Sequence, residues 1–313
     1  METLQKLFLS IIPIILLCSC EANIDKKKRS LACFQHGMSN YQGTQESINA
    51  FAKAVEYDPT HAESWRELSI PFLKRGMPHL WKKYIDKAVE LDPIAWQGYR
   101  GYNYLWFYRD YKNAIADFDA TDTLTPSFID APQGHSVDFW RGIAYLGLKD
   151  YENSIAFFNK HIQKETEETG EDWVEHEAFL YRGIAHYEQS KSKLYLNFNP
   201  KKFENALHNF NTLLKYNTDF ADAKYYKAAV LFEECKMLLQ EIETKGSRYS
   251  NIAHTRIPRE LFEKKKTAAL QIINEAITNF KEGYSDQRPY VETIRQLYLE
   301  DYTNLKAKLE SMH

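Results

Sequence analysis

The stretch WRGIAYLGLKDYENSIAFFN, Trp140 to Asn159, decides the fold. Its opening is nearly repeated as YRGIAHYEQS from Tyr181, and it is echoed as YRGYNYLWFYRDYKNAIADFD from Tyr99. Each copy carries an Arg-Gly pair, and an aromatic or histidine side chain follows three residues after the glycine, on the same helix face. Self-similarity at intervals of about 20 to 50 residues is typical of repeat architectures. The sequence therefore predicts stacked helical units.

Composition supports an all-α fold. The chain has 313 residues, 44% of them hydrophobic and 14% aromatic, with only 12 glycines and 10 prolines. So few helix breakers favour helices throughout. The formal net charge is −3, and both signs are mixed along the chain, which argues against bulk nucleic-acid binding.

No stretch has the spacing of a catalytic or metal site. A glycine-rich phosphate loop, a GxSxG elbow and a DxDxDG calcium loop are absent from the sequence. The run HEAFL begins like a zinc motif, but Leu180 stands where the second histidine is needed. His161, His176 and His186 form the nearest histidine group, and we expect them on different helices and faces. The sequence thus predicts no enzyme activity, no cofactor and no metal.

Prolines mark the ends of the repeating units. Asp58-Pro59 recurs as Asp92-Pro93, 34 residues later, and a weaker Thr125-Pro126 follows. A segment with apolar positions three and four apart precedes each proline, so a helix must stop there and the chain must turn. Gly101, Gly142 and Gly183 are 41 residues apart in both steps. This spacing is longer than the 34 residues between the first two prolines, and the additional residues fall in predicted loops at 125–136, 164–172 and 190–201.

These features resemble the tetratricopeptide repeat. The family's large aromatic, small, apolar and proline positions are filled in one unit by Trp65, Leu68, Ser69, Phe72, Ile85, Ala88 and Pro93. Trp81 departs from the pattern, because the family has a small alanine there, and Pro71 is expected to kink the first helix. The resemblance covers about residues 31–282 and implies an α-solenoid, a right-handed superhelix of helical hairpins. A generic helical bundle is the alternative.

The Arg-Gly glycines and their neighbours fit this pattern. Gly101, Gly142 and Gly183 would occupy the small position where paired helices approach closely, a position that Ser69 and Ala229 hold elsewhere. The second helices carry Phe118, Phe158 and Phe210. A later unit starts at 221–234 and is interrupted before 268–280. A helix over about 288–310, with Tyr290, Ile294, Leu297, Tyr298 and Leu305, would cap the stack within a terminal segment, 283–313.

The first twenty residues are a separate segment. Lys6 precedes an apolar run, Leu7 to Leu17, that is too short to span a bilayer but fits the core of a signal peptide. The run ends in Leu-Cys-Ser-Cys, which resembles the lipobox of bacterial lipoproteins, with Ser19 before Cys20. The resemblance implies a signal peptide over 1–19, acylation of Cys20 and a lipid-anchored protein of the cell envelope. An uncleaved hydrophobic anchor is the alternative.

Residues 20–30 are predicted to be the lipid attachment site and a polar tether. The basic run from Lys26 to Arg29 fits either an anionic lipid surface or a solvated spacer. Glu21 is not the aspartate associated with inner-membrane retention, so the outer membrane is favoured. Cys33 and Cys235 would be the thiols left after processing, either paired or buried separately.

Two sets of residues are candidates for partner binding. Arg100, Arg141 and Arg182 share one register, either as packed structural arginines or as a basic ladder for a carboxylate-bearing peptide. The groove positions that the repeat resemblance implies are Arg66, Ile70, Lys74, Tyr102, Trp106, Phe139, Ile143, Glu177, Ile184, Tyr226, Val230 and Glu233. Such a face, aromatic with charges at both ends, favours a scaffold or adaptor that binds a protein or peptide. The alternative is a surface glycan-binding lipoprotein.

Overall fold

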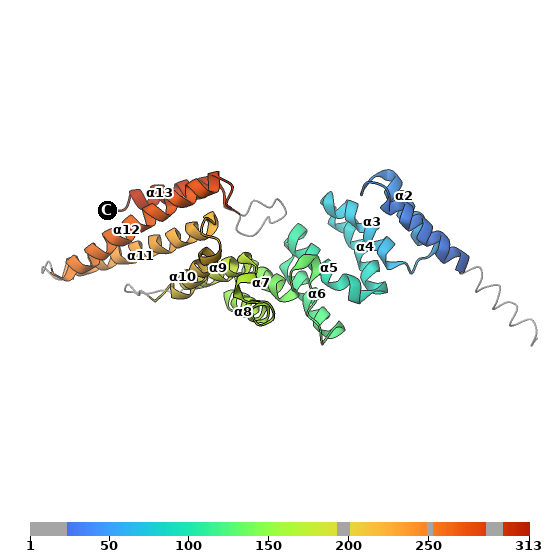
Figure 1. Ribbon diagram of the computed structural model, residues 1–313, viewed down its shortest axis with the longest axis horizontal. Coiled ribbons are helices and arrows are strands. Elements are labelled where there is room, and N and C mark those ends of the chain that lie inside the picture. Colours follow the sequence, from blue (N-terminus) through green and yellow to red (C-terminus); the bar gives the residue numbers. More distant parts are fainter. Residues whose placement is uncertain (1–23, 193–200, 249–252, 286–296) are drawn as a thin grey trace, which may run out of the picture. The chain divides into compact units, whose positions relative to one another are not determined.

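The computed structural model describes residues 24–192, 201–248, 253–285 and 297–313 (Figure 1). Every regular element in these ranges is a helix, so the all-α prediction is confirmed. The chain divides into two compact units, one up to Gln133 and one from Gly134 onward. The division falls inside the 125–136 loop that the sequence predicted. Within each unit, successive helices pack against one another as the hairpins of an α-solenoid.

The first unit holds three hairpins. Its helices are residues 24–38, α2 (Gln45–Tyr57), α3 (Ala62–Lys74), α4 (Pro78–Leu91), α5 (Pro93–Asn103) continuing into the π-helix η1 (Tyr104–Tyr108), and α6 (Tyr111–Leu124). A 3-10 turn, η2 (Pro132–Gly134), lies at the division between the units. Helix α3 runs through Pro71 to Lys74, and Arg75 N donates to Pro71 O at 3.2 Å. Proline lacks the N–H that would bond in the turn before it, so the turn after Pro71 keeps its hydrogen bond.

The second unit also begins with hairpins. Its helices are α7 (Val137–Gly147), α8 (Tyr151–Glu168), the 3-10 turn η3 (Glu171–Trp173), α9 (His176–Ser192), α10 (Glu204–Tyr216), α11 (Ala221–Arg248), α12 (Ala253–Lys281) and α13 (Leu299–Glu310). The interruption predicted after residue 234 proves to be a lengthening of α11 and α12, which have 28 and 29 residues. Their added turns bury a core of their own, including Leu238 and Phe262.

Close helix approach explains the recurring glycines. A Cβ atom added at Gly142 would lie 2.8 Å from Phe158 Cζ, and one at Gly183 would lie 2.5 Å from Phe210 Cε1. Gly101 stands in the same relation to Phe118. The predicted role of these glycines is confirmed. Gly37 also belongs to the series, because its Cβ would lie 2.6 Å from Phe51 Cε1. Sequence reasoning missed Gly37 because no Arg precedes it.

The turns inside the hairpins are also repeated. Gly76, Arg109 and Lys149 are in the left-handed region, with φ of 66°, 53° and 61°. In two of these turns the next residue's amide donates to the carbonyl five residues before it, as Asp150 N does to Tyr145 O at 2.9 Å. At the end of the π-helix, Asp110 N donates instead to Tyr104 O, six residues before it. The carboxylates of Asp110 and Asp150 then cap the second helices.

The structure corrects the prediction of a tether over residues 20–30 in its described part. Residues 24–30 are helical, and Ser30 is buried and donates to Ala54 O at 2.8 Å. The predicted signal peptide, Cys20, and the Tyr290 and Ile294 positions of the capping helix lie outside the described residues. Among the described positions of that helix, Leu305 is buried on α13.

Candidate binding surface

An aromatic and cationic surface lies on α3, α5 and η1 in the first unit. We call it the cation–aromatic face, and it consists of Arg66, Trp96, Tyr99, Tyr102 and Trp106. The Arg66 guanidinium carbon lies 4.7 Å from the Tyr99 ring centroid and 5.3 Å from that of Trp96. The Tyr102 and Trp106 ring centroids are 6.1 Å apart. All five side chains are half-buried. Of the predicted groove residues, Tyr102 and Trp106 contact each other, whereas Arg66 contacts Trp96 and Tyr99.

Local sequence explains the position of this face. Helix α5 starts at Pro93, and the preceding Asp92 caps it by accepting from Ala95 N at 3.1 Å. The aromatic side chains then recur three, three and four residues apart, which aligns them along one helix face. Sequence reasoning missed Trp96 and Tyr99, although this spacing alone was sufficient to find them.

Trp81 lies against the π-helix that carries Trp106. Its ring packs edge-on against Tyr104 at 5.0 Å and lies 4.9 Å from Tyr108. The tetratricopeptide repeat has a small residue at the position of Trp81. The large ring that replaces it packs against the segment where the α-helix gives way to a π-helix. Burial raises the pKa of Tyr102 and of Tyr108 to about 12, so both phenols are neutral at physiological pH.

Charged groups border the cation–aromatic face. Arg66 is paired with the buried Glu67 of its own helix. The exposed Lys74, at the end of the same helix, donates to Gln42 Oε1 at 2.6 Å. Desolvated cation–π contacts such as those of Arg66 contribute about 0.5 to 2 kcal/mol each. The face therefore combines an ordered cation with four large aromatic rings.

The second unit does not continue this face. Phe139 and Tyr226, both predicted groove residues, are buried and correct the prediction of one aromatic groove. Phe139 packs on His135, Trp140 and Phe158, and Tyr226 stacks on Phe210 with centroids 5.6 Å apart. Ile70 of the first unit and Ile143, Ile184 and Val230 of the second are buried too.

The charged groove positions of the second unit are acidic. Glu177 on α9 and Glu233 on α11 are half-buried. Glu233 pairs with Lys236 at 2.9 Å. The predicted groove residues thus gather into one aromatic and basic face in the first unit, and into a buried aromatic set with two separate carboxylates in the second.

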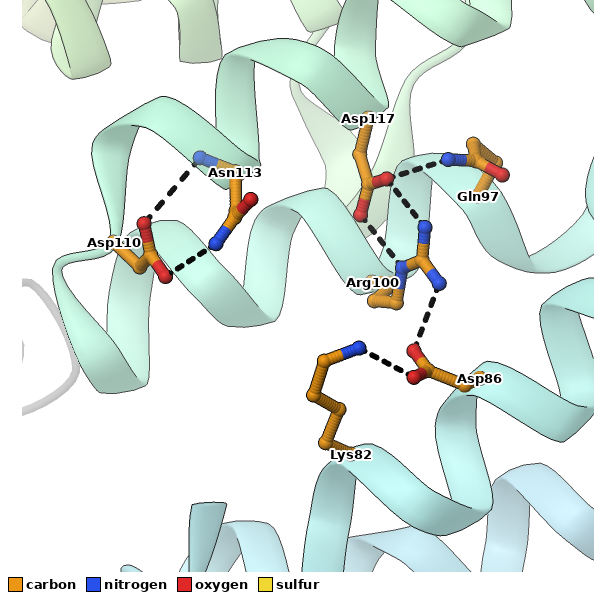
Figure 2. A network of polar contacts seen from close by, with 7 residues as sticks. All are labelled: Lys82, Asp86, Gln97, Arg100, Asp110, Asn113 and Asp117. Carbon is orange, nitrogen blue, oxygen red and sulfur yellow. Dashed lines mark hydrogen bonds and ion pairs between the residues drawn. The ribbon is translucent and has the colours of Figure 1, made fainter. Parts of the chain in front are cut away.

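Arg100 is the centre of a polar network between α4, α5 and α6 (Figure 2). Its Nε and Nη2 atoms donate to the two oxygens of Asp117 at 2.8 and 2.7 Å. Its Nη1 atom donates to Asp86 Oδ1 at 2.8 Å, and Lys82 pairs with the same carboxylate. Burial lowers the pKa of Arg100, but the bonds and charges of Asp117 and Asp86 outweigh it, so the pKa is raised. Arg100 is fixed as a cation.

Arg182 holds the same position on α9 with neutral partners. It donates to Asn209 Oδ1 at 2.6 Å and to Asn159 Oδ1 at 2.9 Å, and so joins α8, α9 and α10. Burial lowers its pKa, and Glu171 opposes that change. Arg141 is 1% exposed, pairs with Asp138 at 2.8 Å and lies over the Phe157 ring. All three arginines hold helices together, which supports the structural interpretation of the ladder.

A histidine cluster in the second unit joins the end of the predicted 125–136 loop to α8 and to Glu175, which directly precedes α9. Glu175 accepts from His135 Nδ1 at 3.1 Å and from His161 Nε2 at 2.8 Å. Ser136 Oγ lies 2.9 Å from His161 Nδ1. Burial raises the pKa of Glu175, but the bonds from the two histidines outweigh it and hold that pKa well below its usual range. Sequence reasoning missed His135 and Glu175 because loops carry no periodic signal.

Other candidate features are isolated side chains. Cys33 and Cys235 are free thiols, and burial raises the pKa of Cys235 to about 12. Within the described ranges, no three histidine, cysteine or acidic side chains are placed to hold a metal ion. None of the described helices combines the length and the apolar character needed to cross a membrane.

Similar proteins are found among the solved structures. The solved structures similar to the chain include the MamA protein, with 16% identity over 62% of this chain and 94% of that one at a TM-score of 0.47. PilF of Pseudomonas aeruginosa has 16% identity over 75% of this chain and 99% of its own, at a TM-score of 0.47. A tetratricopeptide repeat protein from Parabacteroides merdae has 13% identity over 93% of this chain and 100% of its own, at a TM-score of 0.49. A search of the curated proteins finds no match.

A family model matches one hairpin directly. Residues 139–163 match the model of the tetratricopeptide repeat, and they belong to α7 and α8. This is the hairpin from which the sequence analysis started. The chain is therefore an all-α protein of stacked hairpins that carries a tetratricopeptide repeat at residues 139–163.

Proposed function

We propose that the protein is a cell-envelope lipoprotein that binds a protein partner and acts as a scaffold or adaptor, with no catalysis of its own. The observation that carries this proposal is the cation–aromatic face. Tryptophan, tyrosine and arginine are the residue types that contribute most to binding free energy at protein interfaces. Here Arg66 contacts Trp96 and Tyr99, those two rings contact each other, and Tyr102 contacts Trp106. All five side chains are half-buried.

Unused hydrogen-bond donors support the same surface. Trp96 Nε1 and Arg66 Nε are buried without an acceptor in the described part of the chain. A buried donor without a partner costs free energy, so such atoms usually find an acceptor in a ligand or water. A peptide segment with apolar side chains and exposed carbonyl groups would suit both the rings and these donors.

The binding experiment uses aromatic substitutions on and off the face. Trp106→Ala and Tyr102→Ala are each expected to weaken capture of the partner from an envelope extract, with loss of about 2 kcal/mol or more at a hot spot. Trp173→Ala is the matched control, since Trp173 is 74% exposed and lies in the second unit. Trp106→Phe keeps an aromatic ring in the same position, so it tests whether a loss of binding in Trp106→Ala comes from the missing contact or from a disturbed fold. Equal capture by all four variants, with unchanged melting temperature, contradicts the proposal.

The anchor rests on the sequence before the described residues. Cys20 follows an apolar run and a small residue, as in a lipobox, and the proposal places the protein at the membrane through acyl chains on Cys20. The outer membrane is favoured because Glu21 follows the cysteine. Cys20→Ala should remove acyl groups in mass spectrometry of the mature protein, and Cys18→Ala is the matched control. Acylation that survives Cys20→Ala contradicts the anchor.

Glycan binding is the second candidate. Half-exposed tryptophan and tyrosine rings on one face also suit the apolar face of a sugar ring. Retention of the protein on envelope polysaccharide, lost in Trp106→Ala and kept in Trp173→Ala, would favour this function over protein binding. Specific protein capture without polysaccharide retention would favour the scaffold.

A further inference from the structure

The first helix presents an apolar stripe to solvent. Ile24, Leu31 and Met38 are 53%, 47% and 54% exposed. They are seven residues apart, which is close to two helical turns, so they share one face of the helix over residues 24–38. We call these three residues the first-helix stripe. An isolated apolar side chain on a surface needs no explanation, but here three recur on one side of a single helix, about 10.5 Å apart along its axis.

The rotation of this helix is fixed by the core. Ser30 Oγ donates to Ala54 O at 2.8 Å, and Gly37 lies against Phe51. Phe34 packs on Phe51 with ring centroids 5.7 Å apart, and on His61. These contacts fix the face that points toward α2, so the stripe is held on another face. Its exposure belongs to the packed helix.

Basic residues flank the stripe. At 3.6 residues per turn, Lys27 and Lys28 fall on either side of the line through Ile24 and Leu31. Both lysines are exposed. The acidic side chain of this helix, Asp25, is paired with Arg29 at 2.9 Å and lies farther round. An apolar stripe flanked by lysines is the pattern of a helix that lies in a membrane interface, where lysine stems reach to the headgroups.

The covalent distance to Cys20 places the helix beside the bilayer. Three residues lie between Cys20 and Ile24, and the four steps from Cys20 to Ile24 span at most about 14 Å when extended. An acylated Cys20 therefore keeps the start of the helix within about 14 Å of its attachment in the lipid. A soluble peptide partner has no such constraint to this end of the chain, so the position favours a lipid surface as the occupant of the stripe.

We propose that the first-helix stripe inserts into the headgroup region of a membrane that contains anionic lipid, with Lys27 and Lys28 at the phosphates. This inference rests on the proposed anchor, because acylation brings the helix to the membrane. The helix then acts as a second attachment, and it sets which face of the first hairpin meets the lipid. Near an anionic surface, each lysine contributes about 1 kcal/mol and the contribution falls with salt.

The test is cosedimentation with lipid vesicles. The probe is the mature chain, residues 20–313 with Cys20→Ser, which keeps every described residue and lacks acyl chains. It is expected to sediment with vesicles of phosphatidylethanolamine and phosphatidylglycerol, and not with phosphatidylcholine alone. The pair Leu31→Glu and Met38→Glu should lower partitioning about tenfold or more, and so should Lys27→Gln with Lys28→Gln. Ile94→Glu is the matched control, since Ile94 is 60% exposed on α5.

The outcomes separate this inference from the anchor. Equal partitioning of the parent and the stripe variants, with all of them folded by circular dichroism, overturns the inference. So does loss of protein capture in the stripe variants with no change in vesicle binding, because the stripe would then belong to the partner-binding surface. Acylation of Cys20 in cells is measured separately on the full chain. Its failure removes the anchor and leaves the vesicle result as an independent measurement.

Discussion

Arg100 and Arg182 occupy the same position in two hairpins, but their partners differ in charge. Arg100 bridges two carboxylates, Asp117 of its own hairpin and Asp86 of the preceding one. Arg182 bridges two amide oxygens, one from the second helix of its own hairpin and one from the hairpin before. The position therefore requires a guanidinium that joins three helices, and the charge of the groups it joins is variable.

The largest expected effect is that of Arg100→Met. This change leaves the buried Asp117 without its counter-charge, which typically costs about 3 to 5 kcal/mol. Chemical denaturation at pH 7 measures the loss in free energy of unfolding. Arg100→Lys is the control, because it keeps the charge and loses the two-oxygen contact, so its loss should be smaller. A loss below about 1 kcal/mol for Arg100→Met contradicts the assignment.

The pH dependence of this loss has a defined sign. Burial raises the pKa of Asp117 and Arg100 opposes the rise, so removal of Arg100 raises that pKa further. A carboxyl group with a raised folded pKa favours the folded state at low pH and loses that contribution as the pH rises. The cost of Arg100→Met should therefore shrink from pH 7 toward pH 5. A cost that is constant or grows over this range would show that another group dominates.

Arg182→Met should cost less, about 1 to 2 kcal/mol. It leaves the buried Asn209 oxygen without a donor, whereas the oxygen of the exposed Asn159 can bond to water. An unsatisfied neutral acceptor is less costly than an unpaired buried charge. The same denaturation experiment measures it. Losses of the same size for Arg100→Met and Arg182→Met would show that packing of the arginine stem outweighs the charge of its partners.

Asn209→Asp would give Arg182 the same kind of partner that Arg100 has. Asn209 is buried, and its change gives Arg182 a carboxylate partner like Asp117. The single change should lower stability by about 1 to 2 kcal/mol, because it removes the donation from Asn209 Nδ2 to Asn205 O and because desolvation offsets the new ion pair. Added to Arg182→Met, it should raise the loss to about that of Arg100→Met. Additivity of the two changes would contradict this coupling.

The smallest effect lies in the turns of the hairpins. Lys149 is exposed and left-handed, with φ of 61°, where Gly76 stands in another hairpin. Lys149→Gly should raise the free energy of unfolding by about 0.5 to 1 kcal/mol, since glycine adopts this conformation without a Cβ clash. Gly76→Lys is the reciprocal change and should lower stability by a similar amount. If Lys149→Gly lowers stability instead, the greater conformational entropy of glycine in the unfolded chain outweighs the relief of the Cβ clash.

Periodic features of this protein could be predicted from its sequence. The glycines opposite Phe118, Phe158 and Phe210 follow from spacing, because only a small residue lets two helices approach so closely. The lengthening of α11 and α12 was hidden, since their outer turns contact each other and lack the motif that marks the other hairpins. Distance along the sequence alone did not distinguish a loop from a longer helix.

The candidate surface was predictable only in part. Register placed Arg66, Tyr102 and Trp106 among the groove positions. The structure packs Tyr102 beside Trp106 and places Arg66 over Tyr99 of the same helix, α5. The same register failed at Phe139 and Tyr226, which are buried by large neighbouring rings. The depth of a groove position depends on the bulk of the residues around it, and one repeat pattern does not specify that bulk.

The long pair α11 and α12 shows that the length of a hairpin can vary independently of the number of hairpins. At 1.5 Å per residue, 28 residues extend over about 40 Å, whereas the 13 residues of α10 extend over about 20 Å. The added turns bury Cys235, Leu238 and Phe262, and α13 covers part of this pair, since Lys266 of α12 donates to Met312 O just after α13. A hairpin of this kind gains length and buried core without an additional repeat.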